Sequence, residues 1–333
     1  MKTFIENAWQ HGHMLMWLLW PLKLIYAGVT ALRRLMYRLG IKRKVVLDVP
    51  VIVVGNLTVG GNGKTPVVVW LTKLLQQQGY NVGIISRGYG GENQGEMLVD
   101  NHSDPRLCGD EPKLIVNQTN ALMAVGRDRV ATGQLLIAHG IDLDRPLDII
   151  ISDDGLQHYR LARQMEVVVI DGARRFGNNN LLPMGPMREG QWRAKDATLV
   201  INNGGACAFN EELMTLEPSA WRYVESNVVF DKALLAQKEV VAMAGIGYPQ
   251  RFFDTLATQK IPLTATKAFN DHQPYNQDML TPLVRHDQWL VMTEKDAVKC
   301  QTFAQNNWLY VPVTAKLTLS AHQKILDRLK EIL

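Results

Sequence analysis

A glycine-rich turn followed by Lys64-Thr65 is the segment of this chain best suited to binding phosphates. Residues 51–66 read VIVVGNLTVGGNGKTP, which is an apolar strand, a flexible turn and the start of a helix. Glycines allow backbone N–H groups to surround an anion, and a helix N-terminus adds its positive dipole. The pattern indicates a nucleoside triphosphate site, although Thr58 stands where the common pattern has glycine. The residues expected to contact the phosphates are Gly60, Gly61, Asn62, Gly63, Lys64 and Thr65.

Two adjacent carboxylates follow another apolar segment. Residues 147–152, LDIIIS, lead directly into Asp153 and Asp154. A carboxylate at the carboxyl end of a buried strand can hold Mg²⁺ beside bound phosphates, together with a hydroxyl such as that of Thr65. The alternative is a solvated turn without a ligand. We predict a Mg²⁺ site at Thr65, Asp153 and Asp154, and the sequence leaves open which aspartate binds the ion.

Asp110 begins a predicted helix over 110–118, within the sequence GDEP. Its carboxylate either complements the helix dipole or acts as a general base for an attacking hydroxyl. Arg87, in the segment SRGYGG, places one cation on a loop after a predicted strand.

Three further segments carry polar groups. Residues 174–190, RRFGNNNLLPMGPMREG, are too rich in Gly, Asn and Pro for a regular element, and loops of this length usually bind something. Asp271-His272 and residues 293–296, TEKD, lie at the ends of predicted elements. On local sequence alone, both would be ordinary surface groups.

Length and composition limit the possible classes of protein. With 333 residues the chain is long enough for two domains, and its net charge of +4 does not by itself indicate nucleic acid binding. Cys108, Cys207 and Cys300 are far apart and form no CxxC pair. A disulfide framework or a zinc site is therefore not expected, and a reducing compartment is favoured.

The N-terminal region has the pattern of a membrane-surface helix. Residues 14–22, MLMWLLWPL, are apolar, and residues 21–39 have helical amphipathic spacing. One face carries Lys23, Thr30, Arg34 and Arg38, whereas the other is aliphatic. The basic residues 42–44 follow directly. Tryptophan anchors and a basic face are typical of the headgroup region of an anionic leaflet.

Three alternatives compete with this interpretation. A signal peptide is disfavoured because its N-terminal part, which is normally positively charged, would be barely charged here, and no small-residue cleavage site follows. A membrane span would be interrupted by Pro21 and Lys23, and its basic flank would keep the following domains cytoplasmic. A helix that packs into a core has the same periodicity. We favour a peripheral or monotopic anchor.

The rest of the chain alternates between strands and helices, which predicts an α/β fold. Strands are expected at 49–55, 81–86, 121–125, 147–152, 166–171 and 197–202, with helices near 64–78, 110–118 and 127–139. Because the strands are continuously apolar, they should form a parallel sheet buried on both faces. Ligands bind such sheets at the carboxyl ends of the strands, where the motifs above collect.

A second α/β unit is expected after a connector at 205–237. Its elements would be strands at 238–245, 288–296 and 308–313, a helix from Pro249 and a closing helix at 319–332. We therefore predict a membrane-associated helix region at 1–45, a P-loop NTPase-like core domain at 46–225 and a smaller C-terminal α/β lobe at 226–333.

Together, the motifs resemble the tetraacyldisaccharide 4′-kinase (lipid A 4′-kinase) family. The resemblance covers nearly the whole chain, and the GGxGKTP form of the P-loop is the family's own. It is carried in order by VGNLTVGGNGKTP, SRGYGG, GDEP, SDDGLQH, FGNNNLLPMGPMREG, AGIGYPQRFF, FNDHQPY and MTEKDAVKC.

The resemblance implies a kinase at the cytoplasmic face of the bacterial inner membrane. It would transfer the γ-phosphate of ATP to the 4′-hydroxyl of a tetraacylated glucosamine disaccharide 1-phosphate, a lipid A precursor. Its partners would be this lipid and an anionic membrane surface, with no nucleic acid and no obligate protein partner.

The resemblance also implies residue roles. Lys64 would bind the β- and γ-phosphates, and Thr65 with Asp153 or Asp154 would bind Mg²⁺. Asp110 would be the base for the sugar hydroxyl, paired with His272 from the second lobe. The remaining expected contacts to phosphate or substrate are Arg87, Arg188 and Glu189.

Two other functions share part of the pattern. A membrane-surface ATPase switch would have the same P-loop and anchor, but it would not need a second lobe with His272. A GTPase would need Asn-Lys-x-Asp to read its base, and Thr293-Glu294-Lys295-Asp296 has a different order.

Overall fold

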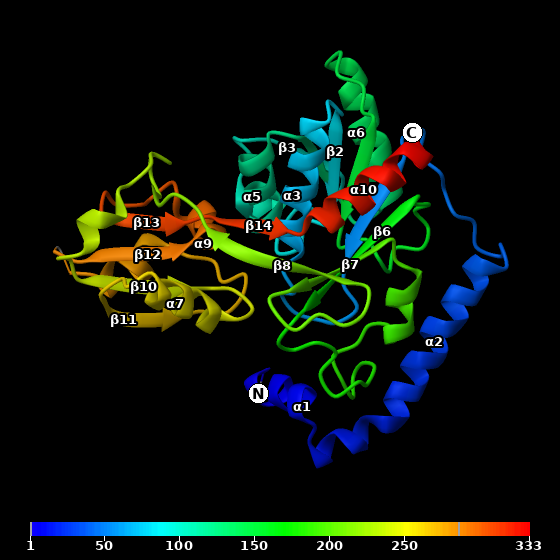
Figure 1. The fold of residues 1–333 in the computed structure, drawn as a ribbon, viewed down its shortest axis with the longest axis horizontal. Coiled ribbons are helices and arrows are strands. Elements are labelled where there is room, and N and C mark those ends of the chain that lie inside the picture. The colour runs from blue at the N-terminus through cyan, green and yellow to red at the C-terminus, as the bar shows by residue number, and fades with distance from the viewer. Residues whose placement is uncertain (1, 286) are drawn as a thin grey trace.

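Nine strands form one sheet in the computed structural model, which describes residues 2–285 and 287–333. This sheet belongs to the larger of two lobes (Figure 1). In spatial order its strands are β14 (Val313–Leu317), β8 (Glu211–Pro218), β7 (Leu199–Asn203), β6 (Met165–Asp171), β1 (Val51–Gly55), β5 (Ile149–Asp153), β2 (Val82–Ser86), β4 (Leu122–Val125) and β3 (Met97–Val99).

The sheet is parallel from β8 to β4, and its two edge strands run antiparallel to their neighbours. β1 lies between β6 and β5 in parallel register, with Val54 opposite Asp153. β3 pairs antiparallel with β4, and β14 pairs antiparallel with β8. Because the central strands are parallel, the ends of β1, β2, β5 and β6 meet at one edge. The predicted parallel sheet is confirmed for its central strands.

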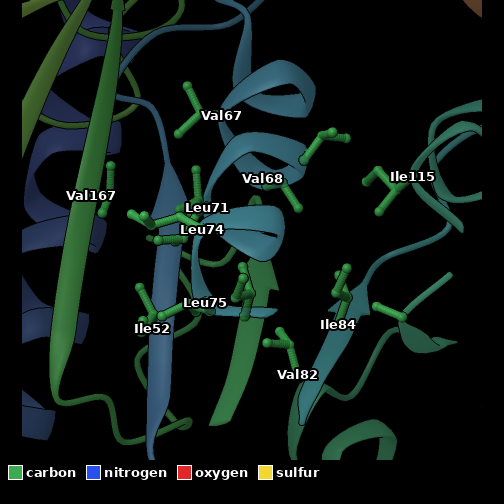
Figure 2. Packing of buried hydrophobic residues seen from close by; sticks show 14 of the residues in the cluster. Ile52, Val67, Val68, Leu71, Leu74, Leu75, Val82, Ile84, Ile115 and Val167 are labelled. Atoms are coloured by element: carbon green, nitrogen blue, oxygen red, sulfur yellow. The ribbon is translucent and has the colours of Figure 1, made fainter. Parts of the chain in front are cut away.

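Helices surround this sheet. They are α3 (Lys64–Gln77), α4 (Pro105–Cys108), α5 (Asp110–Thr119), α6 (Arg129–Asp142) and α10 (Leu319–Ile332), with a 3₁₀ helix, η2 (Gln191–Asp196). Apolar residues of α3 recur at helical spacing and are buried against the strands (Figure 2). In this view Leu71 and Leu75 point toward Ile52 of β1, so the core fixes the helix whose first residue is Lys64.

The smaller lobe has a sheet of five strands within the described residues. In spatial order they are β11 (Leu263–Ala268), β10 (Val240–Ala244), β12 (Trp289–Thr293), β13 (Trp308–Val311) and β9 (Arg222–Tyr223). Its helical segments are η3 (Lys232–Leu235), α7 (Pro249–Thr258), α8 (Gln277–Leu280), η4 (Thr281–Leu283) and α9 (Glu294–Cys300). The predicted second α/β unit is present.

The chain returns to the larger lobe at its C-terminal end, so the expected lobe at 226–333 is too long. Pro312 separates β13, in the smaller sheet, from β14, in the larger one. α10 follows β14 and buries Ala321, Ile325 and Leu329 in the core of the larger lobe. β9 lies before residue 226 and yet belongs to the smaller sheet. Figure 1 shows β8 and β14 running between the two lobes. The predicted single strand at 308–313 is likewise two strands.

The N-terminal segment lies along the outside of the larger lobe (Figure 1). It consists of α1 (Lys2–His11), the 3₁₀ helix η1 (Met14–Leu19) and α2 (Trp20–Arg38). α1 contacts the 174–190 loop, where Nε1 of Trp9 donates to the carbonyl oxygen of Pro183 at 3.0 Å.

The polar face of α2 is turned toward the protein. Nζ of Lys23 donates to Oδ1 of Asn180 at 2.7 Å, and Nη1 of Arg34 lies 3.5 Å from Oε1 of Glu189. The expectation that this face meets lipid headgroups is therefore wrong for Lys23 and Arg34. Their partners, Asn180 and Glu189, belong to the 174–190 loop, which is distant from α2 in the sequence.

The aliphatic face of α2 points outward. Six of its residues and the following Leu39 are between 48% and 63% exposed, the six being Leu22, Leu24, Ile25, Val29, Leu32 and Leu35. The segment Met14–Arg38 is long and apolar enough to cross a membrane: an 18-residue window within it has a mean hydropathy of 1.5, and only 6% of that window is buried. A core-packing helix, one of the alternatives above, would be mostly buried and does not fit this arrangement.

Candidate active site

The glycine-rich turn predicted to bind phosphates connects β1 to α3 at the carboxyl edge of the larger sheet. Gly60 and Gly63 have φ angles of 99° and 88°, in the left-handed region that favours glycine. A Cβ at Gly63 would also lie 2.3 Å from Nδ2 of Asn203. That nitrogen donates to the carbonyl oxygen of Asn62 at 3.1 Å. The conformation of the turn therefore depends on glycine at position 63.

Thr58 has a structural role in this turn. Its hydroxyl oxygen accepts a hydrogen bond from Nδ2 of Asn62 at 2.8 Å, and both side chains are buried. A glycine here would leave the buried amide of Asn62 without this partner. Thr58, which replaces the glycine of the common P-loop pattern, therefore contributes a hydrogen bond that holds the turn together.

Lys64 and Thr65 begin α3, as predicted, and Lys64 points toward the aspartate pair. Its Nζ lies 3.6 Å from Oδ1 of Asp154. Asp154 adopts a φ of 48°, and its carboxylate also accepts from Nη1 of Arg188 at 3.1 Å. Burial raises the pKa of Asp154, but Lys64 and Arg188 outweigh burial, so this pKa lies below its ordinary value.

Asp153 has different surroundings. It is the last residue of β5, it is almost fully buried, and its Oδ2 accepts from Oγ of Ser86 at 3.1 Å. Its Oδ1 is buried and has no hydrogen-bond partner among the residues that the structure describes. Burial, reinforced by the nearby charge of Glu111, raises the pKa of Asp153 to about 6. A buried oxygen without a partner, close to the P-loop, suits a bound cation.

Arg188 and Glu189 point in different directions although they are consecutive. Arg188 faces Asp154, close to the P-loop lysine. Glu189 is buried, pairs with Arg34 of α2, and accepts from Nε2 of Gln157 at 3.2 Å and from the hydroxyl of Tyr159. Their common contact with phosphate or substrate stays a prediction, and Glu189 connects α2 to the site.

The two lobes meet at Asp110 and His272. Asp110 begins α5 in the larger lobe, and His272 follows β11 in the smaller one. Nδ1 of His272 lies 3.0 Å from Oδ1 and 3.1 Å from Oδ2 of Asp110. His272 has a φ of 58°, a conformation that is costly for a non-glycine residue and that tends to occur at functional sites.

Asp110 is buried and yet favoured as a carboxylate. Burial raises its pKa, but the hydrogen bond with His272 and the charges of Lys295 and Lys299 outweigh burial. The pKa therefore lies below its ordinary value, and the group is an ionised acceptor at neutral pH.

Known proteins of one family are similar to this chain over nearly its whole length. The sequence profile of the tetraacyldisaccharide-1-P 4′-kinase family, LpxK, matches residues 15–330. The chain belongs to this family. It is 47% identical over 332 residues to the tetraacyldisaccharide 4′-kinase of Shewanella piezotolerans, covering 100% of this chain and 98% of that protein. It is 48% identical over 334 residues to the enzyme of that name from Shewanella sp. strain MR-4, covering 100% and 97%.

A solved structure has the same fold. It is that of LpxK from Aquifex aeolicus in complex with ATP, with a TM-score of 0.79 and 25% sequence identity. The match covers 95% of this chain and 99% of that one. The resemblance found in the sequence is therefore confirmed, and so are the kinase class and the P-loop α/β fold.

In this member of the LpxK family, the SRGYGG loop also reaches the Asp110–His272 pair. The ring of Tyr89 packs edge-on against the imidazole of His272, with centroids 5.0 Å apart. Arg87 follows β2 and is exposed. Its predicted contact with phosphate or substrate stays a prediction.

Two groups near the site, Lys295 and Asp171, are not among the site residues predicted from the sequence. Lys295, within TEKD, contacts both the Asp110–His272 region and Glu111. Asp171, at the end of β6, forms ion pairs with Arg174 at 3.1 Å and with Arg251 of α7 at 3.2 Å. Arg174 in turn donates to the carbonyl oxygen of Gly61. The position of both groups at the ends of predicted strands was the available signal, but each local sequence also fits a solvated surface.

Proposed function

We propose that this chain transfers the γ-phosphate of ATP to the 4′-hydroxyl of a tetraacylated glucosamine disaccharide 1-phosphate, a step in lipid A biosynthesis. Membership of the LpxK family supports the substrate assignment. The observation in the structure that supports it best is the contact between Asp110 and His272 across the lobes. A base built from two lobes beside a P-loop suits a kinase with a separate acceptor.

The chain's own residues suit an in-line displacement. Asp110 accepts the proton of the 4′-hydroxyl as its oxygen forms a bond to the γ-phosphorus. The bond from this phosphorus to the β–γ bridging oxygen breaks, and ADP leaves with those electrons. Lys64 and the N–H groups of the turn bind the phosphates, and Arg188 is close enough to the same region to assist.

The residues at the end of β5 suit Mg²⁺. The unpartnered Oδ1 of Asp153 is a ligand of the kind that Mg²⁺ prefers, and the hydroxyl of Thr65 begins the adjacent helix. Asp154 already pairs with Lys64 and Arg188, so Asp153 rather than Asp154 would hold the ion directly. When bound, Mg²⁺ would offset the negative charge of the phosphates.

The outward aliphatic face of η1 and α2 would bind the membrane. Trp17 and Leu18 are 66% and 76% exposed, and the aliphatic residues of α2 extend this surface. A span would have to break the bonds of Lys23 and Arg34 to the larger lobe, so a helix lying in the interface is favoured. The exposed basic residues 42–44 would face anionic lipid on the cytoplasmic side of the inner membrane.

A transfer assay tests the proposal. The wild-type protein is incubated with Mg²⁺, the tetraacyldisaccharide 1-phosphate in detergent micelles and ATP radiolabelled at the γ-phosphate. We expect label on the lipid, and none with Lys64→Ala. Release of label only as inorganic phosphate would contradict the kinase and support an ATPase switch.

A further inference from the structure

Lys295 lies where α9 of the smaller lobe meets α5 of the larger one. Its Nζ is 2.9 Å from Oε1 of Glu111, 3.0 Å from Oδ1 of Asp271 and 3.3 Å from Nε2 of His272. Its side chain is only 14% exposed. An ammonium group has three N–H donors and no acceptor, so these three contacts match its three donors.

This arrangement determines which nitrogen of His272 carries the proton. Because the ammonium group of Lys295 can only donate, Nε2 of His272 must accept. In a neutral imidazole the proton is then on Nδ1, which faces the carboxylate of Asp110 at 3.0 Å. An imidazolium would direct Nε2–H at the ammonium group, and Asp271 Oδ1 is 3.7 Å from Nε2, too far for a hydrogen bond.

The opposite tautomer of His272 would prevent Asp110 from acting as a base. With the proton on Nε2, the lone pair of Nδ1 would face the carboxylate of Asp110. The short contact would then need a proton on Asp110, which could no longer accept one from the acceptor hydroxyl.

We infer that Lys295 is a positioning residue, which keeps His272 neutral with its proton on Nδ1 and thereby keeps Asp110 available as a base. This role rests on the proposed function for its consequence in catalysis. Lys295, Asp271 and His272 all belong to the smaller lobe. Contacts within that lobe therefore orient the Nδ1–H group of His272, which faces Asp110 of the larger lobe.

Lys299 provides a matched control. Its Nζ lies 3.9 Å from Oδ2 of Asp110, the same distance as that of Lys295. It donates instead to Asp296 at 3.0 Å and to the carbonyl oxygen of Gln273 at 3.1 Å. Lys295→Met and Lys299→Met therefore remove equal charges near Asp110, and only the first removes a donor to His272.

The test is nitrogen NMR of isotope-labelled histidine in the full-length protein at neutral pH, with the His272 signals assigned from their loss in His272→Gln. We expect a protonated Nδ1 and an unprotonated Nε2 in wild type and in Lys299→Met. Lys295→Met should show a protonated Nε2, whereas the signals of the other histidines stay in place. Lys295→Arg should keep the wild-type pattern.

Kinetics add a second readout. Lys295→Met should lower kcat by about 10- to 100-fold with little change in KM for ATP, more than Lys299→Met does. An unchanged tautomer in Lys295→Met, or equal changes in both methionine variants, would overturn the inference. The wild-type spectrum tests it even if Lys295→Met does not fold, because Nε2–H or an imidazolium would contradict it. The spectrum needs no turnover, so failure of phosphate transfer would contradict only the proposed function.

Discussion

Nδ1 of His272 lies 3.0 Å from Oδ1 of Asp110, although 162 positions separate the two residues and they belong to different lobes. The contact forms at the start of α5, whose N-terminal dipole also favours an ionised Asp110. It places a buried carboxylate at the boundary between the P-loop lobe and the smaller lobe, which a simple ATPase would not need.

Asp110→Asn should affect chemistry and leave nucleotide binding nearly intact. The amide has almost the same shape but cannot accept the hydroxyl proton, so kcat should fall by about 10²- to 10⁴-fold. Steady-state transfer kinetics and calorimetric titration with ATP measure the two effects separately. A collapse of ATP affinity would instead assign Asp110 to the nucleotide or metal site.

Gly63→Ala should weaken ATP binding. The φ of 88° costs an alanine about 1–2 kcal/mol, and its Cβ would displace Asn203 from the turn. We expect KM for ATP to rise by roughly tenfold or more. Gly79→Ala is the control, because Gly79 has a φ of 90° and an added Cβ would have open space around it, with nothing within 4 Å beyond its chain neighbours in the described part of the chain. Equal kinetic effects in both variants would show that turn geometry is not the cause.

Serine substitutions on the outer face of α2 should release the protein from membranes. Ile25, Val29 and Leu32 are 59% to 63% exposed, so the triple variant should keep its thermal stability. Losing about 1.5–3 kcal/mol of apolar burial per side chain should reduce vesicle partitioning by at least about 100-fold.

The matched control places serine at three exposed residues elsewhere, Val228, Leu234 and Leu319, which are 58%, 61% and 87% exposed. Sedimentation with anionic vesicles measures both triple variants. Equal binding of the α2 variant and wild type would assign the anchor to another surface.

Glu294→Gln should stabilise the protein in alkaline solution. Burial of Glu294 beside Gln118 raises its pKa to about 7, so the folded state keeps a proton that the unfolded state has lost. The free energy of unfolding therefore decreases as pH rises from the unfolded pKa through about 7, and the loss is complete above it.

Glutamine stays neutral and removes this penalty. The Tm of Glu294→Gln should exceed that of wild type by a few degrees at about pH 8 and match it at about pH 5, as measured by calorimetry. The exposed Glu225→Gln should show no such pH-dependent difference. An equal Tm at both pH values would mean that Glu294 ionises freely in the folded protein.

The local patterns in the sequence predicted much of the fold. The expected strands at 49–55 and 147–152 overlap β1 and β5, because continuous apolar runs bounded by turns identify buried parallel strands. The helix predicted near 64–78 corresponds to α3, so Lys64 was also placed at the start of a helix. β8 and β14 were missed because they pair with each other across about a hundred residues of chain, and their alternating residues form a less apolar pattern.

The candidate site was only partly predictable. The spacing of α2 identified its two faces, but Asn180 and Glu189, which decide that the basic face points inward, are remote in sequence. Lys295 was passed over because nothing near it in the sequence indicates Glu111 or His272 as neighbours. Side chains from two lobes become one site only through tertiary contacts that local patterns do not contain.

Phosphorus NMR of the product tests the central claim most directly. The wild-type protein, Mg²⁺ and unlabelled ATP are incubated with the tetraacyldisaccharide 1-phosphate, and the extracted lipid is analysed by correlation with sugar protons. We predict a second monoester phosphate coupled to the proton at the 4′ carbon, absent with Lys64→Ala. A lipid that keeps its single phosphate while ATP is hydrolysed, or a new phosphate at another carbon, would contradict the account.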